Sequence, residues 1–132
     1  MKLIDLVEMP MADVYSVERD LTNMFDDIGI KIKFTSHFED RISDGDHRGD
    51  AITKEELLTV FKKLKKKQDQ LIAAKKDRAE LEGVIRDELT NLNVPFALSF
   101  HRNSGKFILT LITAMKKEKK FHTKPNDVVI NV

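Results

Sequence analysis

Residues 96–115, FALSFHRNSGKFILTLITAM, decide the fold class of this chain. Phe96, Leu98 and Phe100 alternate with small or polar residues, which is the two-residue period of a β-strand. Residues 103–105 (Asn-Ser-Gly) are typical of a tight turn, and apolar residues alternate again over residues 107–115. The segment therefore predicts two antiparallel strands joined by a short turn.

The preceding sequence predicts a strand set among helices. Residues 30–34 (IKIKF) alternate without a break, which predicts a half-buried strand. Residues 12–28 carry apolar side chains at three- and four-residue spacing, and Gly29 ends this predicted helix. A short helix is predicted from residue 36 to about residue 43.

A capping signal marks the next helix. Thr53 is followed three residues later by Glu56, the spacing of a capping box, and an apolar stripe continues to Leu64 or beyond. Residues 79–92 predict a further helix, and residues 128–132 a last strand. The expected order is α-β-α-α-α-β-β-β. It predicts one α+β domain, residues 1–132, with its helices packed on one face of a small antiparallel sheet. Residues 1–29 are expected to form an N-terminal helical extension.

Composition narrows the protein class. The chain has 132 residues, 41% of them hydrophobic and 34% charged, which suits one globular core. It has no cysteine, which excludes disulfides, thiolate catalysis and cysteine-based zinc sites. Asp5 and Glu8 interrupt the first apolar run, unlike a secretory signal, and no later run is long enough to cross a bilayer. We therefore expect a cytoplasmic protein without a membrane partner.

Charge is distributed in blocks along the chain. Residues 1–28 carry seven acidic side chains against two basic ones, whereas residues 54–78 carry nine Lys/Arg against four acids. Residues 101–124 add seven Lys/Arg against one acid. Such blocks can steer a polyanion to one face although the net charge is only +1. The same lysines also suit an ordinary solvated surface, and the acidic N-terminal helix could contact a protein partner.

The segment Asp44–Asp50 resembles a calcium loop. When the loop is counted from Asp44, Arg48 stands where an oxygen ligand is required. The apolar residue, Ile52, also comes one position too late. We therefore expect a polar loop and helix cap here, and no metal or other cofactor.

His37 and Arg41 are the first candidates for chemistry. They lie one turn apart on the short predicted helix, and Arg48 follows. An imidazole can transfer a proton near neutral pH while guanidinium groups hold a phosphate, as phosphodiester cleavage requires. A histidine that only packs at the strand end, with Arg41 paired to a neighbouring acid, is the structural alternative.

The segment from Ile32 through His37 and Arg41 to Phe61 resembles the strand-histidine-helix-helix opening of the phage RegB endoribonucleases, which have the RelE/YoeB-like fold. Small phage proteins with an ending similar to residues 119–123 share the pattern. The resemblance implies a helical layer on a sheet, attack by the ribose 2′-hydroxyl and no metal. It also implies catalytic roles for His37 and Arg41. Lys62 occupies the position of the family's second histidine, and His122 is a candidate to replace that histidine.

Two basic segments are candidates for substrate binding. His101 and Arg102 flank the predicted turn, where cations could contact phosphates. Residues 116–124 place Phe121 among lysines, including Lys116, Lys117 and Lys120. This mixture can stack on an unpaired base and hold the backbone, or can form a solvated connector.

Two functions from different classes follow from the sequence. The first is a metal-independent endoribonuclease of phage type, or an RNA-binding descendant of one, that acts on single-stranded RNA. The second is a non-catalytic phage interaction protein, such as a virion or host-takeover factor. A DNA-binding regulator is a weaker third, because no recognition helix with a preceding turn is evident.

Overall fold

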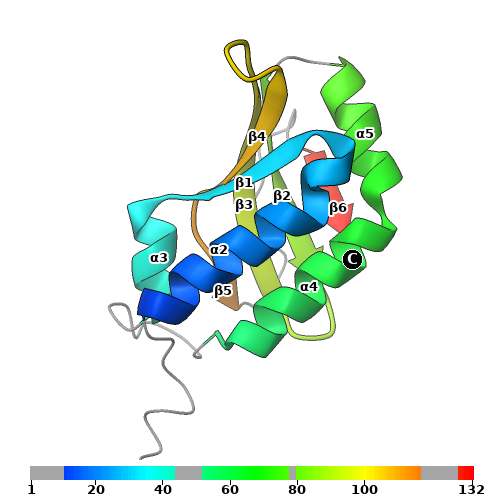
Figure 1. Ribbon diagram of the computed structural model, residues 1–132. Coiled ribbons are helices and arrows are strands. Elements are labelled where there is room, and N and C mark those ends of the chain that lie inside the picture. The colour runs from blue at the N-terminus through cyan, green and yellow to red at the C-terminus, as the bar shows by residue number, and fades with distance from the viewer. Residues whose placement is uncertain (1–10, 44–51, 78–79, 117–127) are drawn as a thin grey trace, which may run out of the picture.

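A computed structural model describes residues 11–43, 52–77, 80–116 and 128–132. Figure 1 shows helices lying over one side of a twisted sheet. The predicted α+β class is therefore confirmed. The elements are α2 (Met11–Phe25), the 3-10 turn η1 (Asp26–Ile28), β1 (Ile30–Phe34), α3 (Ser36–Ser43), α4 (Lys54–Lys66), α5 (Gln68–Asp77), β2 (Glu80–Asp87), β3 (Leu92–His101), β4 (Lys106–Leu111), β5 (Met115–Lys116) and β6 (Val128–Asn131).

The sheet is mixed, so the prediction of an antiparallel sheet is wrong in two of its pairings. The strand order is β1-β4-β3-β2-β6, and β5 also pairs with β3. β3 and β4 are the predicted antiparallel pair, and β2 adds a third antiparallel strand on the other side of β3. β1 lies parallel to β4, and β6 lies parallel to β2. A long connection lets the chain return to pair in parallel. Between β1 and β4 this connection contains the helices α3, α4 and α5 and the strands β2 and β3.

The predicted helix over residues 79–92 is wrong, because most of this segment forms the strand β2. Leu81, Gly83 and Ile85 face the helices, and β2 pairs with β3 on one side and β6 on the other. Leu89 lies in the turn that follows β2 and is 82% exposed. The predicted return strand over residues 107–115 is also shorter, since β4 ends at Leu111.

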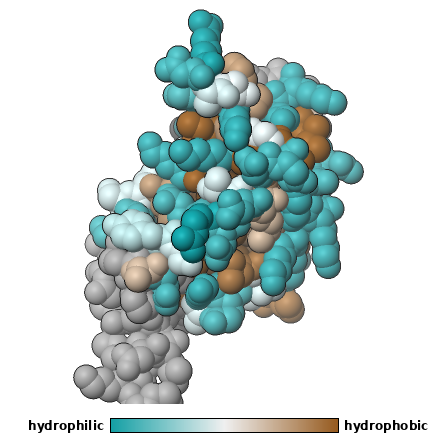
Figure 2. Space-filling view, viewed as in Figure 1, coloured by the Kyte–Doolittle hydropathy of each residue, from teal (hydrophilic) through white to brown (hydrophobic). Residues whose placement is uncertain are grey.

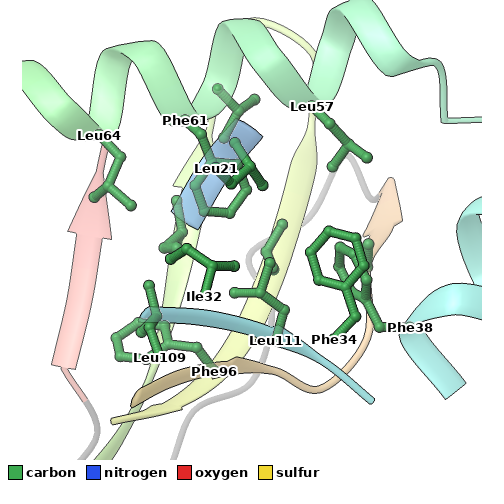
Figure 3. Close-up of a cluster of buried hydrophobic side chains, with 14 of the residues drawn as sticks. Leu21, Ile32, Phe34, Phe38, Leu57, Phe61, Leu64, Phe96, Leu109 and Leu111 are labelled. Carbon is green, nitrogen blue, oxygen red and sulfur yellow. The ribbon is translucent and has the colours of Figure 1, made fainter. Parts of the chain in front are cut away.

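The core lies between the helices and one face of the sheet. Figure 3 shows side chains of α4 facing those of β1, β3 and β4. Phe61 from α4 packs edge-on against Phe25 from α2, with ring centroids 6.4 Å apart. The labelled members of this core are Leu21, Ile32, Phe34, Phe38, Leu57, Phe61, Leu64, Phe96, Leu109 and Leu111.

Local signals fix the helix positions as the sequence predicts. Thr53 accepts a hydrogen bond from the Glu56 N–H at 3.1 Å, and the Glu56 carboxylate accepts one from the Thr53 N–H at 3.1 Å. This reciprocal pair is the predicted capping box. Gly29 has a φ of 73°, the left-handed conformation that ends a helix at lowest cost when no Cβ is present. No helix in the described ranges is long and apolar enough to span a membrane.

Asp87 closes the turn after β2 and ties it to α4. Its carboxylate accepts hydrogen bonds from Lys63 Nζ at 3.2 Å, the Leu89 N–H at 3.2 Å and the Thr90 hydroxyl at 2.9 Å. The Asp87 side chain is 1% exposed and that of Lys63 is 31% exposed. The pair is therefore only partly screened by water.

We expect Asp87→Ala to lower the free energy of unfolding by about 2 kcal/mol, because Lys63 and two turn donors lose their acceptor. Urea titration followed by circular dichroism measures the change. Glu88→Ala is the matched control. The Glu88 side chain is 74% exposed, and its distance of 4.0 Å from Arg86 makes at most a weak ion pair. An equal loss in both variants would contradict the role given to Asp87.

Candidate functional site

A groove of about 860 Å³ runs along the outer side of β1. The flank of α2 forms one wall. Side chains from the outer sheet face form the other wall. α3 borders one end and the β3–β4 hairpin the other. The lining residues are Tyr15, Glu18, Arg19, Thr22, Lys31, Ile32, Lys33, Phe34, Glu39, His101, Ser104, Lys106 and Ile108.

Two side chains of α2 hold it against the free edge of β1. The Thr22 hydroxyl donates to the Ile32 carbonyl at 3.1 Å and lies 3.3 Å from the Ile32 N–H as an acceptor. Glu18 Oε2 accepts the Phe34 N–H at 2.7 Å. These bonds satisfy edge groups that would otherwise be open to another strand. α2 is therefore fixed beside β1, and the groove has a firm wall.

The strand alternation places a row of lysines along the groove. Ile30, Ile32 and Phe34 are buried, so Lys31 and Lys33 point to the opposite, exposed face. Phe107 pairs with Ile30 in parallel, so Lys106, one residue earlier, lies beside Gly29. Gly29 has no side chain. We call Lys106, Lys31 and Lys33 the lysine ladder.

The spacing of the lysine ladder suits a polyanion. Lys31 and Lys33 are two residues apart, or about 6.6 Å along the strand. Lys106 is a diagonal neighbour of Lys31 on the paired strand, at roughly 7–8 Å. These steps resemble the separation of neighbouring phosphates in an extended nucleic-acid strand. Lys106 also contacts Asp26 at 2.8 Å, but both side chains are about half exposed, and a phosphate can replace such a surface partner at small cost.

Tyr15 and Arg19 occupy the α2 wall, one turn apart on the helix. Tyr15 is 58% exposed, unusual for so large a ring, and it lines the groove. Arg19 is exposed and adds a cation opposite the lysine ladder. Figure 2 shows that the face carrying α2 and β1 is mostly hydrophilic.

Two carboxylates mark the α3 end of the groove. Partial burial raises the pKa of Glu39, and the charges of Glu18 and then Asp40 raise it further. Glu18 is already held by the Phe34 N–H, so its orientation is set by the backbone of β1. The groove is therefore cationic along β1 and acidic beside α3.

The β3–β4 hairpin carries His101 and Arg102, both exposed. The predicted turn is confirmed, with Gly105 at a φ of 69°. His101 Nδ1 lies 3.1 Å from the Ser104 hydroxyl, which orients the ring. Of the pair, His101 lines the groove, next to the lysine ladder.

The candidate catalytic residues are spread over different elements. His37 is exposed on α3, whereas Arg41 on the same helix is 8% exposed. Lys62 is exposed on α4, opposite the buried stripe that includes Phe61. α3 packs against α2 and β1, and α2 packs against α4. Lys62 and His37 therefore project from separate helices.

The length of β1 also separates His37 from His101. α3 follows the end of β1, and the hairpin lies at its start. Four steps along the strand amount to about 13 Å. Five further candidates cannot be placed by their side chains. Lys116 is described only by its backbone in β5. The other four candidates, which are Arg48, Lys117, Lys120 and His122, lie outside the described residues, as does the whole segment Asp44–Asp50.

Sequence reasoning missed most of the groove. Tyr15, Arg19, Lys31 and Lys33 were assigned to amphipathic elements without a functional role. The polar positions of IKIKF are both lysine, and this was the one signal that could have marked a cationic strand face. The described residues contain no group of three or more His, Asp or Glu that could hold a metal ion.

Comparisons of the chain with protein-family models, with curated proteins and with solved structures found no match.

Proposed function

We propose that this chain binds single-stranded RNA in the groove between α2 and β1. The observation that carries the proposal is the lysine ladder of Lys106, Lys31 and Lys33, at steps suited to successive phosphates. Arg19 adds a fourth cation from the facing wall. Cations in such a row neutralise phosphates and release their counterions, which is the main source of affinity for any nucleic-acid backbone.

The exposed Tyr15 favours a single strand over a duplex. Bases of an unpaired strand can leave the backbone and stack on an aromatic ring, whereas paired bases are already stacked. In the groove, a backbone on the lysine ladder would direct bases toward α2 and Tyr15. An RNA ligand and a chain without cysteine both fit the cytoplasm, where we place this activity.

Affinity for RNA should fall steeply with salt. Three to four neutralised phosphates give a slope of log affinity against log salt of about −2 to −3 for single strands. Raising salt from 50 to 200 mM should then weaken binding about 20- to 50-fold. Fluorescence anisotropy with a labelled ten-nucleotide RNA measures this slope, and a duplex of the same sequence is the control. A flat salt response, or tighter binding of the duplex, would contradict the proposal.

Endoribonuclease activity is the second candidate, and the exposure of His37 favours it. An accessible imidazole can exchange protons with a substrate at neutral pH. Arg41 is almost buried, so we assign it to holding α3 in place rather than to a phosphate clamp. The resemblance to the RegB family supports 2′-hydroxyl attack without a metal.

His37→Ala should reduce RNA cleavage about a hundredfold to ten-thousandfold, with RNA affinity nearly unchanged, because a general acid or base acts mainly in the transition state. Cleavage in the presence of EDTA, with the products examined for cyclic phosphate, measures the effect. His101→Ala is the comparison, and it should weaken binding while keeping the rate at saturation. If the wild-type protein left RNA intact, or if His37→Ala cleaved RNA as fast as the wild type, catalysis by His37 would be contradicted. RNA binding would then be the proposed function that remains.

A further inference from the structure

We infer that the α3 end of the groove selects bases that carry an amino group, through the carboxylates of Glu18 and Glu39. The inference rests on the proposed binding of single-stranded RNA.

The two carboxylates are neighbours at the α3 end of the groove. Both line the groove, and the charge of Glu18 helps to raise the pKa of Glu39. Glu18 uses Oε2 to accept the Phe34 N–H at 2.7 Å. Its other oxygen has no such bond to the backbone of β1. Glu39 comes from α3, which packs against both α2 and β1. The acidic end is thus built from two helices around one strand.

Carboxylates repel phosphates, so the α3 end of the groove suits hydrogen-bond donors of a base better than it suits the RNA backbone. The edges of adenine, cytosine and guanine present amino groups that donate hydrogen bonds to carboxylate oxygens. Uracil presents one N–H between two carbonyl oxygens, and these oxygens face a carboxylate unfavourably. With the backbone on Lys31 and Lys33, a base directed toward α2 meets Tyr15 by its face and the carboxylates by its edge.

The ring of Tyr15 strengthens the selection without causing it. Stacking on an aromatic ring tolerates every base, since each base has a π-face. A stacked base is held in one plane, and its edge then points consistently at the same protein groups. The discrimination comes from the carboxylates, and Tyr15 supplies affinity that all bases share.

The test compares oligocytidine with oligouridine of ten nucleotides, two pyrimidine strands of equal length and charge. Wild-type protein should bind oligocytidine about tenfold more tightly, a ratio within the range that one well-formed base contact provides. Glu39→Ala should reduce this ratio to less than about twofold. Glu39→Gln should reduce it by improving oligouridine binding, because an amide both donates and accepts.

Asp40→Ala is the matched control for charge. It removes one carboxylate from the same helix, but Asp40 does not line the groove. The tenfold preference should therefore survive in this variant. Thermal melting by circular dichroism verifies that each variant is folded. If Glu39→Ala does not fold, Glu39→Gln still tests the selection, because glutamine has nearly the same shape as glutamate.

Each remaining outcome overturns a defined statement. Equal affinity of the wild type for both strands would overturn the base selection and leave RNA binding intact. If Glu39→Ala tightened both strands by the same factor, Glu39 would act only by repulsion, and the selection would be wrong. If neither strand bound at low salt, the proposed function itself would fail.

Discussion

Lys31→Glu combined with Lys33→Glu is expected to weaken RNA binding at 50 mM salt by a hundredfold or more, because two attractive charges become repulsive. Both side chains are exposed on a strand whose buried positions are Ile30, Ile32 and Phe34, so the fold should not change. The salt slope should become shallower by about 1.4, at roughly 0.7 for each phosphate that is no longer neutralised. Fluorescence anisotropy over a range of salt concentrations measures both effects.

Lys62→Glu combined with Lys66→Glu is the matched control for this reversal. It makes the same change in net charge on α4, at two exposed positions outside the groove. Affinity should fall only a few-fold in this variant, through the general field of the protein. If the two double variants lost affinity equally, RNA would bind to the field of the whole molecule rather than to the groove.

Gly83→Ala is expected to cost about 3 kcal/mol of stability, a large part of the 5–15 kcal/mol typical of a small domain. A Cβ at Gly83 would lie 2.3 Å from the Val128 carbonyl oxygen and 2.7 Å from the Phe96 ring. The carbonyl belongs to the backbone of the paired strand β6, so it cannot move aside without loss of that pairing. Urea denaturation monitored by circular dichroism measures the loss.

Gly105→Ala separates this clash from the general effect of replacing a glycine. Gly105 has a φ of 69°, which strains an alanine by about 1 kcal/mol, but no atom of the described residues lies within 4 Å of its added Cβ. We therefore expect a clearly smaller loss than in Gly83→Ala. Equal losses would mean that β6 does not pack on Gly83 as described.

The segment around Gly83 also explains the largest error in the sequence prediction. Leu81, Val84 and Ile85 recur at three- and four-residue spacing and so fit a helix, but Leu81 and Ile85 fit the inner face of a strand equally well. Pairing with β3 on one side and β6 on the other decides in favour of the strand. Both partners follow β2 in the chain, and β6 is more than forty residues distant. No local pattern can record such a pairing.

Some residues of the candidate site could be identified from the sequence, whereas the groove itself could not. His101 was identified from its place beside a turn signal, and the structure puts it in the groove. The alternation predicts that Lys31 and Lys33 are exposed, but two lysines on a strand indicate a binding site only when another element forms a groove beside them. α2 and the lysine from β4 provide that setting, through Thr22, Glu18 and the pairing of β1 with β4.

By itself the sequence determined the α+β class, the alternation that exposes Lys31 and Lys33, the capping box at Thr53 and the turn between β3 and β4. Each is a matter of hydrogen bonding or side-chain period within a few residues, and such signals are complete in a short segment. Only the tertiary structure decided that β2 is a strand, that β1 and β4 run in parallel, and that α2 closes the edge of β1. These features depend on burial and pairing between segments far apart in the chain, where the free energy of the whole core outweighs local preference.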